Sequence, residues 1–378
     1  MTTIEIKKID TTSKDDVRRF VDVPFELYAD CPQWVPPLRP DVRTMLNRDK
    51  HPFYEHSDAD FFVAVQDGQD VGRVGALENR RFNSYHDTRQ AQFYLFECVD
   101  DQEVANALFG RVFEWARGRD LDTVVGPKGF SPFDGYGIQV EGTEHRQMMM
   151  MMNYNYDYYP RLVEALGFEK EVDFVSTYIK LADFDVPDRI HHIAERVKER
   201  RNLTVHSFSS KLELRRWKGR IGEAYNRTFV DNWEYYPLTQ KEIDFTFSDL
   251  VLAAIPELIK VVLHEDDIVG FIFGFPDVSK GLQRANGRLF PFGILHLLLD
   301  MRRTNWISLN GVGIVPEFQG LGGNALLYSE MAKTVLSDFD FVHAELTQVA
   351  ESAVQMRHDL INLGAKPYKN HRVYSRKI

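Results

Sequence analysis

Cysteine is the scarcest residue of the 378-residue chain, which contains only Cys31 and Cys98. Secreted proteins of this length commonly use more cysteine for disulfides, so two thiols favour a reducing compartment. The twelve histidines include no His-x-x-x-His spacing and no Cys/His cluster, the usual sequence signs of a metal site. We therefore expect a cytoplasmic protein that binds no metal.

Long apolar runs are also missing. The two most apolar stretches, residues 250–263 and 290–301, are short and are interrupted or ended by charged residues. Both fall below the ~20 apolar residues that a membrane-spanning helix needs. The first sixteen residues show no apolar core of a secretory signal. The sequence therefore predicts neither secretion nor a membrane partner.

Positive charge is in deficit, with 46 lysines and arginines against 56 acidic residues and a formal net charge of −10. A net negative surface repels phosphate backbones and weakly disfavours anionic membranes, so we expect no nucleic-acid partner. The chain is 44% hydrophobic and 27% charged, a globular composition, and its length suits two domains. Composition leaves the oligomeric state open.

Short patterns recur in the same order in the two halves. An apolar strand and a polar turn lead to a Val-Gly pair ending at Gly72 and again at Gly270. A helical pattern leads to a Leu-Gly pair ending at Gly167 and again at Gly364, with an offset that differs by one residue. This repetition predicts one structural plan used twice. The Pro- and Asp-rich break ADFDVPD then separates a domain of residues 1–182 from a domain of residues 183–378.

The most informative segment runs from residue 306 to residue 330. A β-rich strand continues to about Val315 and is stopped by Pro316, which cannot donate to a strand ladder. The glycine-rich QGLGGN follows and a helical pattern begins, so exposed amides and a helix N-terminus form an anion site. Neither the mononucleotide P-loop spacing nor the dinucleotide G-x-G-x-x-G spacing fits these glycines. The alternative is a plain tight turn before a helix.

The run IVPEFQGLGG resembles the coenzyme A segment of the GNAT superfamily of N-acetyltransferases, written V-x-P-x-x-[QR]-x-x-G-x-[GA]. This resemblance implies that the strand lies along the pantetheine arm and holds the oxyanion, while the loop amides hold the pyrophosphate. Asn324 stands where the family prefers Gly or Ala. Carried over by position, the cofactor-binding residues are Gly313, Ile314, Val315, Gln319, Gly320, Leu321, Gly322, Gly323 and Asn324.

The resemblance also implies the fold, an α+β protein with tandem acyl-CoA N-acyltransferase (GNAT-like) domains and mixed, mostly antiparallel sheets flanked by helices. In the first half, the acidic stretch 100–103 replaces the glycine loop. Carboxylates at a helix N-terminus satisfy the dipole and repel a phosphate. We therefore expect only the second half to bind acetyl-CoA or another acyl-CoA.

Catalysis of this type needs a base for the attacking amine and stabilisation of an oxyanion. Glu345 lies on the predicted strand FVHAEL, and His343 would share its face, so either side chain could serve as the base. Asn310 on the neighbouring strand could orient the substrate. The alternative for Glu345 and His343 is an ordinary solvated strand face.

The acid for the leaving thiolate is harder to assign. The resemblance places an acidic tyrosine four residues before Gly364, but this position is Leu360. Tyr368 and Tyr374 are nearby in sequence, and Tyr374 is the candidate we carry forward. Tyrosines at such positions are more often core or surface residues.

The resulting hypothesis is an enzyme, an N-acyltransferase that transfers an acyl group, most simply acetyl, to a small-molecule amine. One alternative is a non-catalytic protein that binds an acyl-CoA or small metabolite, which Leu360 and Asn324 favour. Another is an aminoacyl- or peptidyl-type transferase on the same fold. The methionine run 148–152, followed by tyrosines, either lines an apolar groove or fills a core.

Overall fold

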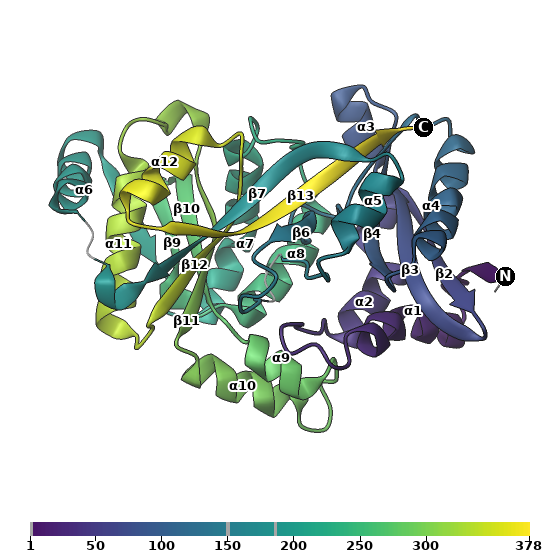
Figure 1. Cartoon of the computed structure of the whole chain (residues 1–378). Coiled ribbons are helices and arrows are strands. Elements are labelled where there is room, and N and C mark those ends of the chain that lie inside the picture. Colours follow the sequence, from purple (N-terminus) through teal and green to yellow (C-terminus); the bar gives the residue numbers. More distant parts are fainter. Residues whose placement is uncertain (1–2, 149–151, 185–186) are drawn as a thin grey trace. The chain divides into compact units, whose positions relative to one another are not determined.

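The computed structural model describes residues 3–148, 152–184 and 187–378 of the chain (Figure 1). It divides into two compact units, and neither is a continuous segment. The first unit comprises Met1–Val175, Val278–Asp300 and Lys369–Ile378, and the second comprises Ser176–Asp277 and Met301–Tyr368. The sequence predicted one boundary between residues 182 and 183, which assigns the segments 278–300 and 369–378 to the second domain. In the structure both segments belong to the first unit.

A mostly antiparallel sheet forms the first unit, with the strand order β1-β2-β3-β4-β5-β13 and β6 paired to β13. Among the strand pairs formed by the described residues of this unit, β4 and β5 are parallel. The C-terminal strand therefore completes the sheet of the first unit, where Tyr374 lies opposite Gly126. The strands are β1 (Ile4–Lys8), β2 (Asp58–Gln66), β3 (Gln69–Glu78), β4 (Gln90–Cys98), β5 (Thr123–Gly126), β6 (Ile138–Glu141) and β13 (Lys366–Lys377).

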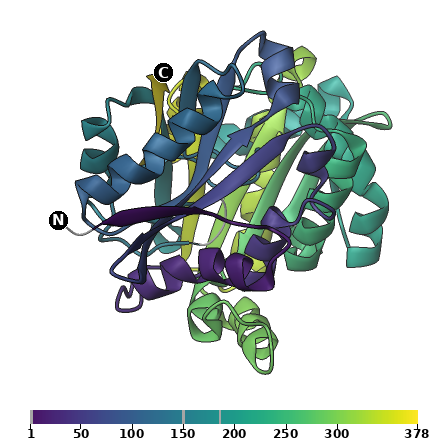
Figure 2. The same cartoon turned by 90° about the vertical axis from the view of Figure 1, so that its right-hand side faces the viewer.

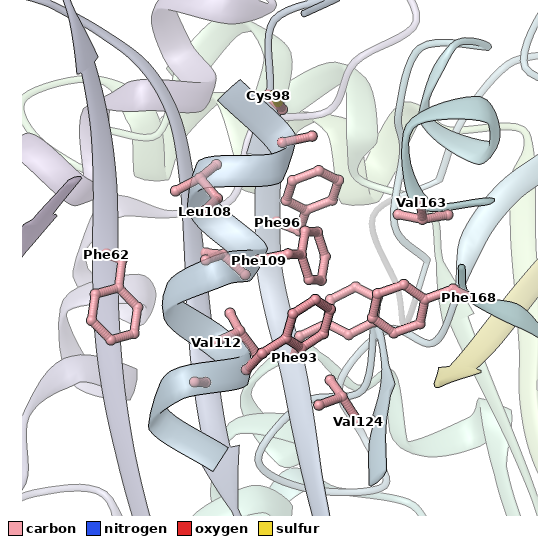
Figure 3. Close-up of a cluster of buried hydrophobic side chains, with 14 of the residues drawn as sticks. Phe62, Phe93, Phe96, Cys98, Leu108, Phe109, Val112, Val124, Val163 and Phe168 are labelled. Atoms are coloured by element: carbon pink, nitrogen blue, oxygen red, sulfur yellow. The ribbon is translucent and has the colours of Figure 1, made fainter. Parts of the chain in front are cut away.

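Helices cover both faces of this sheet, as Figure 2 shows for the blue α4 and the purple α1. Strand β2 is buried on both faces because its alternate residues enter different cores. Phe61 packs with Phe20 of α1, whereas Phe62 belongs to the cluster around Leu108 of α4, drawn in Figure 3. The helical elements are α1 (Lys14–Leu27), α2 (Arg39–Leu46), η1 (Pro52–Glu55), α3 (Arg80–His86), α4 (Gln102–Arg117), α5 (Tyr159–Ala165), α9 (Ser279–Ala285) and α10 (Gly293–Arg303).

The second unit repeats the plan with the strand order β7-β12-β11-β10-β9-β8, to which β7 contributes residues 176–180. Helix α11 covers one face of its sheet, and α7 and α8 cover the other. The strands are β7 (Glu169–Lys180), β8 (Leu203–Ser207), β9 (Ile259–His264), β10 (Asp267–Pro276), β11 (Trp306–Ile314) and β12 (His343–Ala350). The helical elements are η2 (Leu181–Asp183), α6 (Asp188–Arg201), α7 (Lys211–Thr228), α8 (Gln240–Ala253), η3 (Pro256–Leu258), η4 (Pro316–Phe318), α11 (Gly323–Asp338) and α12 (Val354–Asn362).

The glycines of the two Val-Gly pairs are required for the same reason in both units, because the neighbouring strand lies too close for a Cβ. Gly72 lies opposite Cys98, and Gly270 lies opposite Ile314. A Cβ on Gly72 would lie 2.9 Å from the Glu97 carbonyl oxygen, and a Cβ on Gly270 would lie 2.3 Å from the Ile314 side chain. The two strands that face these glycines each carry a bulge next to a residue with positive φ. The predicted α+β class with mostly antiparallel sheets is confirmed.

Strand β13 also carries a buried titratable group, His371, whose Nε2 lies 2.9 Å from the Asn153 carbonyl oxygen. Burial lowers the pKa of His371 to about 4. Because an unfolded histidine has a pKa of about 6.5, the unfolded state binds the extra proton first as pH falls. This contribution to stability is complete above about pH 6.5 and is lost between pH 6.5 and about 4.

We therefore expect His371 to make the fold acid-sensitive, with a loss on the order of 2 to 3 kcal/mol between pH 7.5 and pH 4.5. Urea unfolding followed by circular dichroism at both pH values measures this loss. The His371→Gln variant keeps a donor for Asn153 and should show the smaller difference between the two pH values. Equal differences in the two proteins would show that His371 does not titrate on unfolding.

Candidate functional site

The candidate site begins at an open strand edge in the second unit. Strand β11 pairs with β10 over its whole length but pairs with β12 only from Trp306 to Leu309. Gly311, at φ 73°, is the extra residue of a bulge just beyond this point. The last part of β11 therefore has one edge paired with β10 and the other edge free of β12.

Two amides of β11 point to the open edge. The Val315 N–H donates to the Val269 carbonyl at 2.9 Å, and its own carbonyl accepts from Phe318. Because N–H directions alternate along a strand, the amides of Ile314 and Val312 point the other way, toward the open edge. The predicted role therefore fits Ile314 but not Val315, whose main-chain groups are used. The open edge also presents the amide of Val312, which the sequence reasoning did not name.

The loop after β11 presents a group of main-chain amides. Gly320 and Gly322 adopt φ 70° and 92°, and Gly322 is the N-cap of α11 without a side-chain cap. Among the described residues, the amides of Gly320, Gly322, Gly323 and Asn324 have no hydrogen-bond partner. No acidic side chain lies in the first turn of α11, so its positive end is available to an anion.

Neighbouring side chains fix the shape of this loop. The Gln319 amide nitrogen donates to the Ile314 carbonyl at 3.2 Å, so this side chain ties the loop to the strand. A Cβ on Gly322 would lie 2.5 Å from the Val197 side chain of α6, whereas a Cβ on Gly320 would meet nothing within 4 Å. Gly322 is therefore required by both space and backbone conformation, and Gly320 by conformation alone.

In the first unit, the end of β4 and the start of α4 correspond to the open edge and the glycine loop. Side chains of the protein itself bond to the main chain there. The Tyr159 hydroxyl accepts from the Cys98 N–H at 3.0 Å and donates to Glu97, and the Tyr158 hydroxyl donates to the Cys98 carbonyl at 2.7 Å. Helix α4 is capped by Asp101, whose carboxylate accepts from the Glu103 amide. These contacts support the expectation that only the second half binds an acyl-CoA. Of the methionine run, 149–151 lie outside the described residues and Met148 is buried.

An apolar cavity of about 70 Å³, open to solvent, lies beside the open edge. It is enclosed by β11, β12, α11, α12 and the end of β7. Aliphatic side chains dominate its wall, and Asn310 and Thr347 are its polar members near the bulge. The wall includes Ile179, Leu181, Ile272, Ile307, Leu309, Val312, Tyr328, Met331, Ala332, Val335, Ala344, Leu346, Val349, Met356 and Leu363.

The other face of the same strands carries polar side chains. Ser308 pairs in register with Glu345, and alternation directs both to the face opposite Leu309 and Leu346. Both are buried, and the Ser308 hydroxyl has no hydrogen-bond partner among the described residues. Asn310 lies two residues further along β11, opposite Phe273. The structure thus brings Glu345 and Asn310 to neighbouring positions on β12 and β11, with Asn310 at the bulge where β11 also borders the cavity.

Aromatic rings surround this polar group on the side of α7 and α8. Phe271 contacts Tyr225 and Phe229 of α7, with ring centroids 6.3 and 5.7 Å apart. Phe273 contacts Phe247 of α8 at 6.4 Å. Burial raises the pKa of the Tyr225 hydroxyl, so it stays protonated. The face suits an amine attached to an apolar body.

The predicted acid, Tyr374, is not part of this arrangement. It belongs to the core of the first unit, is 1% exposed, and its hydroxyl donates to Glu164 at 2.9 Å. Leu360 lies fully buried in the core of the second unit. His343, the alternative base, is hydrogen-bonded to the Tyr178 hydroxyl at 2.7 Å and stacks on Trp306. No assigned tyrosine therefore reaches the open edge.

The described residues 3–148, 152–184 and 187–378 include neither a metal-binding cluster nor a membrane-spanning helix. Within these residues, no three His, Cys, Asp or Glu side chains come together in a way that could hold a metal ion. None of the described helices is long and apolar enough to cross a membrane.

Comparison with known proteins gives distant relatives over the full length. No protein-family model matches the chain. Protein YghO of Escherichia coli K12 is 26% identical over 97% of this chain and 94% of its own length. Bacterial ceramide synthase of Caulobacter vibrioides is 25% identical over 100% of this chain and 99% of its own. A tandem GNAT protein from the clavulanic acid biosynthesis pathway superposes with a TM-score of 0.56 at 12% identity, covering 99% and 98% of the two chains. The predicted tandem GNAT-like fold is confirmed.

Proposed function

We propose that this chain of tandem GNAT-like fold is an acyl-CoA-dependent N-acyltransferase whose second unit binds the donor. The proposal rests on three features that lie next to one another around strand β11. The open edge of β11 offers the Val312 and Ile314 amides, the next loop offers four unpartnered amides, and an apolar cavity lies alongside. Pantetheine, pyrophosphate and an acyl chain each match one of these features.

The donor supplies an acyl group already activated as a thioester. The chain's own contribution is to hold and orient the reactants and to move one proton. The amides at the open edge stabilise the negative charge that develops on the carbonyl oxygen. Glu345 accepts the proton of the attacking amine as the nitrogen–carbon bond forms and the carbon–sulfur bond breaks. The carbon–sulfur electrons leave on the coenzyme A sulfur, and because alkyl thiols such as cysteine ionise near pH 8.5, we assign no dedicated acid.

We propose further that the acyl chain is longer than acetyl. The side chains that line the cavity are mostly aliphatic, and each methylene of a longer chain buried against them contributes ~0.8 kcal/mol. The Caulobacter relative is named for ceramide, an amide of a fatty acid and a long-chain amine. The rings of Phe271 and Phe273 beside Asn310 favour an acceptor of the same kind, an amine on a hydrocarbon chain.

Turnover with defined donors and acceptors tests the proposal. Acetyl-, octanoyl- and palmitoyl-CoA are each offered with sphinganine, glucosamine and a peptide amine, and free thiol is measured. Aminoacyl-tRNA is offered with the same acceptors, and the amide product is measured. We expect thiol release above background with a long-chain donor and sphinganine. Binding of acyl-CoA without thiol release would favour the metabolite-binding alternative, and activity only with aminoacyl-tRNA would favour the aminoacyl-transferase alternative.

Filling the cavity should change the choice of donor. Ala332 lies on α11 in the cavity wall and is 9% exposed, so Ala332→Phe places a ring in the acyl space. We expect kcat/KM for palmitoyl-CoA to fall about tenfold to thirtyfold, because several methylenes lose their contacts. With acetyl-CoA, any kcat/KM should change by less than about threefold.

A matched substitution on the surface controls for this variant. Ala253→Phe makes the same change at an exposed position of α8, outside the cavity wall, and should leave both donors unaffected. A uniform loss for all donors in Ala332→Phe would indicate a general folding defect and would contradict an acyl-chain role for the cavity.

A further inference from the structure

An exposed apolar stripe lies on α10 and the residues before it, apart from the candidate site. Phe290 and Phe292 are 76% and 66% exposed, and Leu295 and Leu298 are more than half exposed. In α10 the positions 294, 295, 298 and 302 follow helical spacing, so they share one face. Solvated apolar side chains gathered within nine residues are uncommon on a protein that meets only water.

The stripe is built on an ordered support within the first unit. The Gly281 amide of α9 donates to the Asp300 carboxylate of α10 at 2.6 Å, which joins the two helices. The Gln283 side chain donates to the Pro32 and Trp34 carbonyls at 2.9 and 3.0 Å. The hairpin of α9 and α10, labelled in Figure 1, is therefore held in place while its apolar face stays uncovered.

Basic residues flank the stripe in a chain that is acidic overall. Asp300 is the only acidic residue between 279 and 303, and it is buried and bonded to Gly281. The formal charge of this segment is therefore +4, against −10 for the whole chain. The exposed cations are Lys280, Arg284, Arg288, Arg302 and Arg303. The expectation of no membrane partner came from the short apolar runs and from the average charge, and the average hides this local excess.

We propose that α9 and α10 dock the protein on the surface of a bilayer that contains anionic phospholipid. Helix α10 has 11 residues, too few to span a bilayer but enough to lie in its interface. In this position Phe290, Phe292, Leu295 and Leu298 enter the boundary between headgroups and acyl chains. Arg302 and Arg303 extend toward the phosphates, each cation near the surface being attracted to anionic lipid.

The charge pattern favours a membrane over a second copy of the chain. In a symmetric dimer the same surface of each copy meets its partner, so the cations around one stripe would face those around the other. Like charges opposed in this way cost free energy, whereas an anionic surface neutralises all of them. This inference does not depend on the proposed acyltransferase activity.

Flotation with lipid vesicles tests the proposal on the full-length protein. Vesicles of phosphatidylcholine that contain about 30 mol% phosphatidylglycerol are compared with vesicles of phosphatidylcholine alone. We expect binding to the mixed vesicles that weakens with salt. The variant F290S/F292S/L295S/L298S should bind at least about tenfold more weakly, because four apolar side chains no longer enter the interface.

Two further variants test whether exposed leucines elsewhere also contribute to vesicle binding and whether the cations set the lipid preference. L212S/L252S removes two comparably exposed leucines from α7 and α8 and should bind as the wild type does. R302E/R303E should lose the preference for phosphatidylglycerol while the thermal stability stays unchanged. Binding that is equal in the wild type and the α10 variant would overturn the proposal. So would a wild type that ignores vesicles and forms a dimer that the α10 variant abolishes, as measured by light scattering.

Discussion

Gly320→Glu is expected to weaken coenzyme A binding by at least about thirtyfold. The new carboxylate would stand among the amides of Gly322, Gly323 and Asn324, where we propose that the pyrophosphate binds. Two unit charges 4 Å apart repel by about 4 kcal/mol at an effective dielectric constant of 20, and solvent and salt reduce this to about 2 kcal/mol. A loss of about 2 kcal/mol corresponds to about thirtyfold in Kd. Isothermal titration of coenzyme A measures it.

The position suits this experiment because a side chain on Gly320 meets nothing within 4 Å. Gly320→Gln is the matched control, since glutamine has the same shape and suffers the same strain at φ 70° but carries no charge. We expect the glutamine variant to bind within about threefold of the wild type. Similar Kd values for the glutamate variant, the glutamine variant and the wild type would place the pyrophosphate elsewhere.

Glu345→Gln is expected to lower kcat for amide formation by at least about hundredfold, the usual contribution of a general base. Glutamine keeps the size of the buried side chain but cannot take the proton from the amine. The donor should still bind, because Glu345 lies on the face of β12 opposite the cavity wall formed by Ala344 and Leu346. Single-turnover rates with saturating palmitoyl-CoA, beside a Kd for the same donor, separate the two effects.

Ser308→Ala provides the neighbouring control. It removes the hydroxyl that lies in register with Glu345 but leaves the carboxylate in place, so kcat should stay within about tenfold of the wild type. Unfolding temperatures of both variants check that the buried face tolerates the changes. A Glu345→Gln enzyme that keeps more than a tenth of wild-type kcat would assign the base to another residue, with His343 as the next candidate on the same strand.

Local sequence was sufficient to predict the parts of the site that are formed by residues adjacent in the chain. The end of β11 at Pro316, the positive φ of Gly320 and Gly322, and the start of α11 all depend on residues that are neighbours in sequence. The repeated glycines, Gly72 and Gly270, indicated the duplicated plan because each faces a strand that approaches too closely for a Cβ. Backbone conformation and close approach restrict the residue type, so these features are visible in one sequence.

Strand pairing between distant residues was not visible in the sequence. Tyr374 was a reasonable candidate by its distance along the chain, but β13 pairs with β5 and carries it into the core of the first unit. Val312 and the cavity wall depend on where β12 separates from β11. Alternation predicts that residues share a strand face, but only the sheet order decides what that face meets.

The sequence by itself determined the tandem plan and the glycine-rich loop for which we propose anion binding, since both rest on short-range conformational limits of glycine and proline. The tertiary structure decided which residues surround that loop, how the segments 278–300 and 369–378 join the first unit, and which faces of β11 and β12 meet apolar or polar surroundings. These choices are made by contacts between residues far apart in sequence, whose free energies no local pattern contains.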